Sequence, residues 1–223
     1  LYARDNRSGT WDTFKSLVLR KRYKLSSAAR RFESNDELSD LVSSDVQGIG
    51  FVGLASVRQS RALLVSDTGT TPLLPKKLSV ATEDYALSRR LFLYTPPSLK
   101  TKEIQAFVDF VQTDLGQQQV ESTGFVSQAL IATEPLVLRQ GPREYLDATQ
   151  AADRLSVNFR FAQGSARLDN KAWQDIQRLV AYMAREENKD QQITLVGFGD
   201  VKQTESRATV SYTHLTLPTK RIV

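Results

Sequence analysis

The residues best suited to chemistry form one short stretch, Arg-Asp-Asn-Arg-Ser-Gly-Thr at positions 4–10, followed directly by apolar residues at helical spacing. This pattern predicts a helix that begins after Ser8, and the first amides of a helix have no intrahelical partners. An anion at such a position is held by backbone N–H groups and by the positive end of the helix dipole. Gly9 lets a ligand approach the backbone closely, and the hydroxyls of Ser8 and Thr10 add donors. One of the two arginines in the stretch can supply a guanidinium, which suits a tetrahedral oxyanion.

The same residues have a simpler interpretation, and the sequence alone does not separate the two. Ser8 by itself is a good helix N-cap, worth about 1 kcal/mol. Arg89 and Arg90 are similarly ambiguous, because they could line an anion cleft or pair with Glu83 or Asp84. The binding interpretation requires that the amides of residues 8–10 are open to a ligand and not bonded within the protein.

The composition removes most catalytic chemistries. The 223-residue chain has no cysteine and a single histidine, His214. Disulfides, zinc fingers, iron–sulfur clusters and cysteine nucleophiles are therefore excluded, and His-based metal sites and Ser-His-Asp catalysis are nearly so. No nucleotide-type glycine loop occurs, and no apolar run approaches the roughly 20 residues of a membrane-spanning helix. We expect a binding protein and not an enzyme, with no cofactor or metal.

The charge balance is weak evidence for a polyanionic partner. The chain has 30 Lys+Arg against 25 Asp+Glu, which gives a formal charge of +5. The basic residues at 20–22 and 30–31 are followed closely by acids, which favours a solvated face. We therefore expect no nucleic-acid partner.

The elements that must position the stretch alternate along residues 1–132, which predicts an α/β domain. The expected helices, each with apolar residues at helical spacing, begin after Ser8 and cover residues 35–44 and 101–119. The expected strands are short β-prone runs at residues 2–4, 47–53, 61–66, 78–81 and 91–94. Residues 21–31 are expected to form a loop, and Trp11 to lie in the core.

A second, smaller unit is expected after a linker. Residues 133–151 contain prolines and polar residues without clear periodicity, and they predict the linker. Residues 155–161 alternate strictly between apolar and polar, a helix is expected at 169–188, and a strand at 192–198. These elements predict a β-α-β unit over residues 152–209, with Trp173 in its core.

Several segments resemble PstS-type periplasmic phosphate-binding proteins. Residues 4–10 with Phe14 are similar to the Arg-x-Asp-x-Ser-Gly-Thr segment of that family. Further similar segments lie downstream, at residues 47–52, 85–95, 107–117 and 124–126. The resemblance covers roughly residues 1–128 and implies a partial type II periplasmic-binding-protein fold, in which two α/β lobes close on phosphate.

The resemblance also implies site residues. At the matching positions Arg4, Ser8, Gly9 and Thr10 would contact the anion. Asn6 stands where the family has an aspartate that accepts the proton of hydrogen phosphate, and an amide both accepts and donates. Selectivity for phosphate over sulfate is therefore expected to suffer. The family's first-lobe ligands precede the matching segment and are absent here, so we expect weak or no phosphate binding by this chain.

The second unit resembles an OmpA-like peptidoglycan-binding domain, an α+β fold of which this sequence would hold an incomplete β-α-β part. The similar segments are residues 157–161, 164–169 and Gly-Phe-Gly-Asp at 197–200. The resemblance implies that Asp200 binds the peptidoglycan stem peptide together with a later arginine. Arg207 lies only about half the family's usual interval after Asp200, so we expect that arginine to be lost with truncation.

The last residues, 210–223, are expected to be non-native, because residues 211–219 resemble a translated sequencing adapter. The beginning is likewise expected to lie inside a longer protein. Together the resemblances imply an envelope or periplasmic phosphate-binding component of an ABC transporter, with a transporter permease as partner and a cell-wall-binding domain. The alternative is a structural, peptidoglycan-anchored protein whose first module senses phosphate or binds a partner. An enzyme acting on a phosphoester would need a metal or nucleophile cluster that this sequence does not offer.

Overall fold

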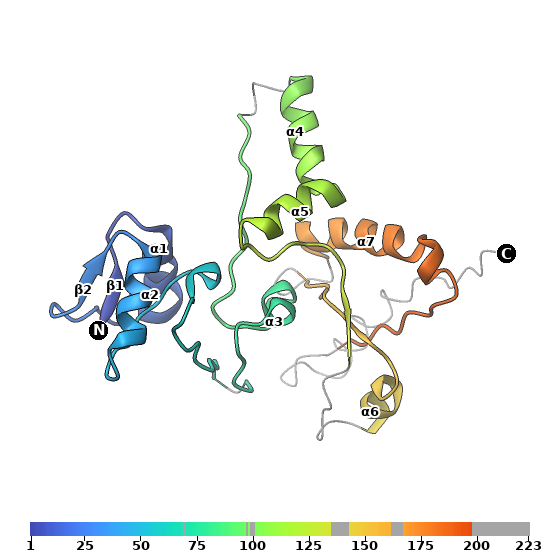
Figure 1. Ribbon diagram of the computed structural model, residues 1–223. Coiled ribbons are helices and arrows are strands. Elements are labelled where there is room, and N and C mark those ends of the chain that lie inside the picture. The colour runs from blue at the N-terminus through green and yellow to red at the C-terminus, as the bar shows by residue number, and fades with distance from the viewer. Residues whose placement is uncertain (69, 97, 99–100, 135–142, 162–166, 198–223) are drawn as a thin grey trace. The chain divides into compact units, whose positions relative to one another are not determined.

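The computed structural model describes residues 1–223 except residues 69, 97, 99–100, 135–142, 162–166 and 198–223 (Figure 1). The described chain mixes helices with short strands. It divides into two compact units, Leu1–Ala129 and Leu130–Val223.

The first unit begins with a small parallel sheet. Strand β1 (Tyr2–Arg4) pairs in parallel with β2 (Arg30–Phe32), so part of the expected loop at residues 21–31 is a strand. Tyr2 also forms a parallel bridge with Gly50, and its N–H donates to the carbonyl of Ile49 at 2.8 Å. Neighbouring parallel strands must be joined by crossover connections, and here each of the two connections contains a helix.

Helix α1 (Gly9–Phe14) continues into a π-helical turn, Lys15–Leu19, and lies between β1 and β2 in the chain. Helix α2 (Asn35–Ser44) lies between β2 and the Gly50 segment. Both helices pack beside the sheet (Figure 1). The start of the first unit is thus the α/β arrangement that the sequence predicts.

Helix α2 confirms the prediction for residues 35–44, and its signals are local. The Ser34 hydroxyl caps it by accepting the Glu37 N–H at 3.2 Å. Leu38 is fully buried on its inner face. A Cβ added at Gly50 would lie 2.8 Å from Cδ2 of Leu38, so a glycine is needed where the helix crosses this segment.

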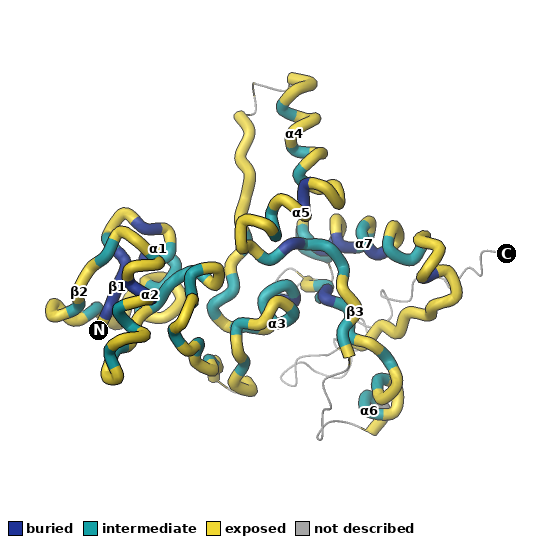
Figure 2. Tube along the Cα trace, in the orientation of Figure 1, coloured by how far each residue is buried: buried dark blue, intermediate teal, exposed yellow. Residues whose placement is uncertain are grey.

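The core of the first unit gathers around β1 (Figure 2). Trp11 is buried there, as expected, together with Tyr2 and Ala3. The ring of Phe14 stacks on Phe51, with centroids 4.0 Å apart. These contacts fix helix α1 against the sheet and thereby set the position of its first residues.

Most of the other strands expected in this unit are wrong. Residues 78–81 lie in helix α3 (Lys77–Ala81), and of residues 47–53 only Gly50 pairs, through its bridge to Tyr2, before the 3-10 turn Leu54–Ser56 begins. Residues 61–66 contribute only a single antiparallel bridge, Val65 with Leu73, and residues 91–94 form no strand. Residues 61–66 are mostly exposed and residues 91–94 wholly so, and apart from the Val65–Leu73 bridge no strand in the described part of the chain pairs with them.

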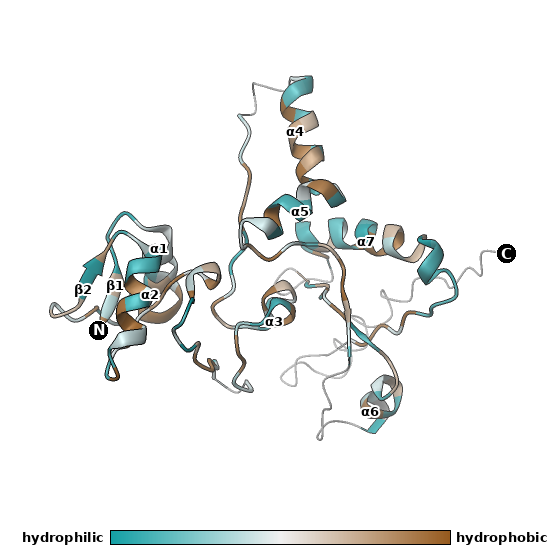
Figure 3. Ribbon diagram, in the orientation of Figure 1, coloured by the Kyte–Doolittle hydropathy of each residue, from teal (hydrophilic) through white to brown (hydrophobic). Residues whose placement is uncertain are grey.

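The helix expected at 101–119 is two helices, α4 (Lys102–Gln112) and α5 (Asp114–Ser122). The break is at Thr113, which is extended and caps α5 by accepting the Gly116 N–H at 3.2 Å. A Cβ at Gly116 would lie 2.2 Å from the Phe110 carbonyl oxygen, so the joint is tight. None of the apolar residues of α4 (Figure 3) is buried and Phe107 is exposed (Figure 2), so the expected inward face is only partly covered within the described chain.

The described residues of the second unit form two short strands and two α-helices. Strand β3 (Ala132–Thr133) pairs antiparallel with β4 (Arg154–Leu155), and α6 (Arg143–Thr149) lies between them in the chain. The expected linker at 133–151 therefore contains regular structure. Helix α7 (Asn170–Met183) is followed by the 3-10 turn Glu186–Asn188.

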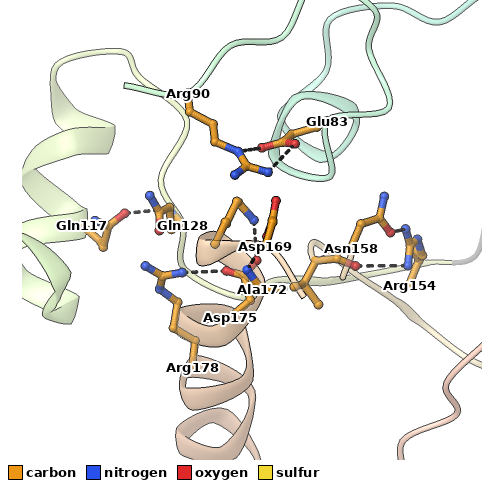
Figure 4. A network of polar contacts seen from close by, with 12 residues as sticks. Glu83, Arg90, Gln117, Gln128, Arg154, Asn158, Asp169, Ala172, Asp175 and Arg178 are labelled. Atoms are coloured by element: carbon orange, nitrogen blue, oxygen red, sulfur yellow. Dashed lines mark hydrogen bonds and ion pairs between the residues drawn. The ribbon is translucent and has the colours of Figure 1, made fainter. Parts of the chain in front are cut away.

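Helix α7 begins where a local cap predicts it, at Asp169, whose carboxylate accepts the Ala172 N–H at 2.8 Å. Its most buried charge is Asp175, 2% exposed, which pairs with Lys171 at 2.5 Å and with Arg178 at 2.6 Å (Figure 4). The expectation that Trp173 lies in the core is wrong, because its side chain is 62% exposed. The face of α7 that is buried carries Ala172 and Leu179 together with Asp175.

The strands expected in the second unit are much shorter than predicted. Of residues 155–161, only the start lies in β4, and Phe161 forms one bridge with Leu168. Residues 192–197 are exposed and form no strand. Asp200, Arg207 and the suspected adapter lie outside the described residues.

Candidate anion-binding site

The candidate site lies directly after the carboxyl end of β1, where the chain turns into α1. In open α/β sheets, ligands bind beyond the carboxyl ends of parallel strands. The Asp5 carbonyl accepts the Ser8 N–H at 3.3 Å, and its carboxylate accepts the Arg7 N–H at 3.2 Å. These two bonds fold residues 5–8 into a tight turn, so the backbone of Gly9 starts α1 in a defined position.

Ser8 is the N-cap of α1. Its Oγ accepts the N–H groups of Thr10 at 3.1 Å and Trp11 at 3.4 Å, and the residue is buried. The simpler of the two interpretations of Ser8 is therefore observed. A hydroxyl that accepts two bonds still has its own proton to donate, so capping leaves one donor at Ser8.

The amides of residues 8–10 are not all open, and to that extent the sequence expectation is wrong. The amides of Ser8 and Thr10 are bonded to Asp5 and to the Ser8 hydroxyl, because the cap draws them inward. Gly9 is exposed, and its N–H has no acceptor among the described residues. Open donors at the start of α1 thus come from the Gly9 amide and from the hydroxyls of Ser8 and Thr10.

Arg4 is buried to 9% exposure, and its guanidinium is directed at carbonyl oxygens. Nε donates to the Phe32 carbonyl at 3.2 Å, Nη2 to the Glu33 carbonyl at 2.5 Å, and Nη1 to the side-chain oxygen of Asn35. These bonds tie the end of β1 to the segment between β2 and α2. A guanidinium has five N–H donors, so two remain without a recorded acceptor in the described chain.

Arg89 and Arg90 have different surroundings. Arg90 forms two bonds with the Glu83 carboxylate, at 2.6 and 3.0 Å (Figure 4), as one of the sequence alternatives expects. Arg89 instead lies against the start of α1: a methyl group added at Gly9 would be 3.5 Å from its Nη2 and 3.7 Å from its Nη1. The structure thus brings a guanidinium to Gly9 from 80 positions further along the chain.

Two other residues are expected in a binding site, Asn6 and Asp200. Asn6 is exposed, and no contact of its side chain is recorded among the described residues. Asp200 lies outside the described residues. The structure therefore places Ser8, Gly9 and Thr10 at the start of α1 and adds Arg89, which sequence reasoning weighed without placing, whereas the Arg4 guanidinium is bonded to residues 32–35.

The surroundings of the site are electropositive and held in place. The Arg31 guanidinium donates to the Arg4 carbonyl at 2.8 Å and lies 4.3 Å from the centre of the Trp11 ring. Asp12, in the first turn of α1, pairs with Lys15 at 2.9 Å. Hydroxyls, an open amide and guanidinium groups can hold an oxyanion, but they supply no base to activate a nucleophile.

The other end of β1 is fixed by a titratable pair. The Tyr2 hydroxyl donates to Asp45 Oδ2 at 2.8 Å. This bond, with a further one from the Gln47 N–H, lowers the pKa of the Asp45 carboxyl, and the same carboxylate raises the pKa of Tyr2. The pair ties β1 to the end of α2, at the opposite end of the strand from the candidate site.

The described residues offer neither a metal cluster nor a membrane-spanning helix. They contain no group of three or more His, Asp or Glu side chains arranged to hold a metal ion. None of their helices has the length and hydrophobicity that crossing a bilayer requires.

Comparison with known proteins links the chain to phosphate-binding proteins. A phosphate-binding protein PstS of Borreliella burgdorferi is 27% identical over 129 residues, 55% of this chain and 46% of that protein. A phosphate-binding protein PstS of Staphylococcus saprophyticus is 33% identical over 135 residues, 56% and 40% of the two chains. A third, from Staphylococcus epidermidis, is 28% identical over 155 residues, 66% and 45% of the two chains. Over about half of its length the chain is therefore homologous to PstS proteins.

The similarity covers only part of this chain and part of each relative. The chain spans less than half the length of these relatives. No family model matches it. The crystal structure of PstS from Borrelia burgdorferi aligns with 56% of this chain and 52% of its own, at 26% identity and a TM-score of 0.42.

Proposed function

We propose that this chain is part of a phosphate-binding protein that captures a tetrahedral oxyanion without transforming it. Two observations support the proposal: the relatives are named phosphate-binding proteins, and the Gly9 amide is an open donor at the start of α1. The second carries the proposal, because it gives a particular backbone group that an anion can reach.

The anion would be held by donors of graded strength. The Gly9 amide and the hydroxyls of Ser8 and Thr10 supply neutral hydrogen bonds, each worth about 0.5–1.5 kcal/mol net. Arg4 would act mainly by holding the backbone at the end of β1, since three of its bonds go to residues 32–35. Asn6 would contribute an amide where a proton acceptor is needed to recognise hydrogen phosphate.

The cellular role follows the same proposal. We propose that the protein acts in the cell envelope as the substrate-binding component of an ABC transporter, with a permease as partner, and that it is not an enzyme. The donor set supports the last point, because it binds an oxyanion and offers no general base. Peptidoglycan binding by the second unit stays a prediction, because Asp200 lies outside the described residues.

The proposal is tested by isothermal titration of the full chain with inorganic phosphate, with chloride at equal ionic strength as the control. A chain with only these donors should bind weakly, with Kd nearer the millimolar than the micromolar range, about −4 kcal/mol. Sulfate should bind with similar affinity. Heats equal to those of the chloride control at all phosphate concentrations would contradict the proposal.

A further inference from the structure

We propose that Arg89 is the charged contact of the anion at Gly9 and sets the strength of that site. The inference rests on the proposed function and goes beyond it, because Arg89 lies outside residues 4–10. It is carried by the position of the guanidinium against Gly9, by its lack of a competing carboxylate, and by the way in which the neighbouring residues hold it.

The guanidinium of Arg89 lies close to Gly9, the residue that carries the open amide of the candidate site. Its two terminal nitrogens are 3.5 and 3.7 Å from the point where a Cβ of residue 9 would stand. Because residue 9 is a glycine, it places no side chain of its own between these nitrogens and its backbone. An oxyanion bound to the Gly9 amide would meet a planar fork of N–H donors.

Arg89 also has no carboxylate partner among the described residues, unlike its neighbour. Arg90 forms a bidentate pair with Glu83, and both of those side chains are mostly buried. Arg89 is exposed, and no ion pair or hydrogen bond of its side chain is recorded in the described ranges. A positive charge without its own counter-ion has more to gain from a bound anion than a paired one.

The segment that carries Arg89 is held in place. The Arg90–Glu83 pair links the two ends of the turn at residues 83–90. The Tyr85 N–H donates to the Ser79 carbonyl at 2.9 Å, and the Ser88 N–H to the Tyr85 carbonyl at 2.9 Å, so the turn is tied to helix α3. A guanidinium on a fixed backbone loses less freedom when it binds an anion than one on a loose loop.

The test uses the full chain, labelled with nitrogen-15, and inorganic phosphate as the probe. Kd is read from the shift of the Gly9 amide for the wild type, Arg89→Gln, Arg89→Lys and Arg61→Gln. Arg61 is exposed and has no recorded contact with residues 4–10, so its variant makes the same change of charge elsewhere. Each titration is repeated at low and at physiological ionic strength.

We expect Arg89→Gln to raise Kd by about tenfold at low salt and to flatten its salt dependence. Arg89→Lys should recover part of the affinity, because it restores the charge without the fork. Arg61→Gln should match the wild type. A purely structural role of Arg89 would not change the salt dependence in this way.

The outcomes separate the two proposals. If the Gly9 amide of the wild type shifts with phosphate and Arg89→Gln binds equally tightly, the role of Arg89 is overturned and the proposed function stands. If the wild type shows no phosphate-dependent shift, both are overturned. Equal losses of affinity in Arg89→Gln and Arg61→Gln would show that the loss depends on net charge alone. That result would also overturn the role of Arg89.

Discussion

At the scale of single residues, Gly9 combines two roles that a substitution should separate. It is the first residue of α1, where alanine costs nothing sterically: the added methyl group would be in ordinary contact, 3.5 Å from Arg89. Alanine also reduces the freedom of the unfolded chain, which is worth about 0.4–1 kcal/mol. The same methyl group would occupy the space between the amide and the guanidinium, where the anion is proposed to bind.

Gly9→Ala should therefore raise the melting temperature and weaken phosphate binding at the same time. Thermal unfolding followed by circular dichroism measures the first effect, and the phosphate-dependent shift of the Thr10 amide measures the second. Gly53→Ala is the matched control, because a Cβ there meets no atom within 4 Å. Unchanged phosphate binding in Gly9→Ala would place the anion elsewhere.

Tyr2 and Asp45 give a second prediction at this scale, on pH. Hydrogen bonds from Tyr2 and from the Gln47 amide lower the pKa of Asp45 in the folded state. A lowered folded pKa stabilises the protein above the unfolded value of about 3.9, and this contribution is lost as the pH falls through the folded pKa. Tyr2→Phe removes the main bond, so it should destabilise the chain at neutral pH and much less in acid.

Urea unfolding of the wild type and Tyr2→Phe at neutral pH and below about pH 4 provides the measurement. The difference in unfolding free energy between the two proteins should shrink on acidification. A difference that stays constant over this range would mean that the bond to Asp45 is not what stabilises β1.

At the scale of elements, the joint between α4 and α5 is tight, because Gly116 in the first turn of α5 lies against the backbone at the end of α4. A Cβ at Gly116 would lie 2.2 Å from the Phe110 carbonyl oxygen and 2.8 Å from the Val111 Cα, and neither backbone atom can move alone. Gly116→Ala should therefore destabilise the first unit by about 1–3 kcal/mol, as overpacking does. Chemical unfolding measures this, with Gly53→Ala as the control; equal midpoints for the two variants would contradict the tight joint.

Elements with local signals could be predicted from the sequence. The cap at Ser34 and the buried Leu38 define α2, and the cap at Asp169 defines the start of α7. The Thr113-Asp114 pair carried the same kind of signal for the start of α5, and it was missed because the apolar spacing continues across it. Caps are therefore better guides to helix boundaries here than apolar periodicity.

Strands were predicted poorly, for a physical reason. A β-prone run becomes a strand only when a neighbour satisfies its backbone groups, and that neighbour is usually distant in sequence. Residues 2–4 find partners at residues 30–32 and 50, whereas residues 61–66 and 91–94 find almost none in the described chain. The exposed Trp173 is a related error, since helical spacing alone does not show which face of α7 is covered.

At the scale of the whole molecule, half of the candidate site could be predicted and half could not. The contiguous residues 4–10 stood out because a helix start, a glycine and two hydroxyls follow one another. Arg89 could not be placed, because nothing local shows which of two adjacent arginines pairs with Glu83. The unit Leu1–Ala129 contains both parts of the proposed site, so its anion chemistry is expected to be independent of the second unit.

The central claim is that an oxyanion binds at the amide of Gly9. The most direct measurement is the proton and nitrogen-15 shift of that amide in the full chain as inorganic phosphate is added at constant ionic strength. The account predicts a saturable shift, largest at Gly9 and its neighbours Ser8 and Thr10, that sulfate reproduces. A Gly9 amide that stays unchanged while phosphate reaches tens of millimolar, roughly tenfold above a millimolar Kd, would contradict it.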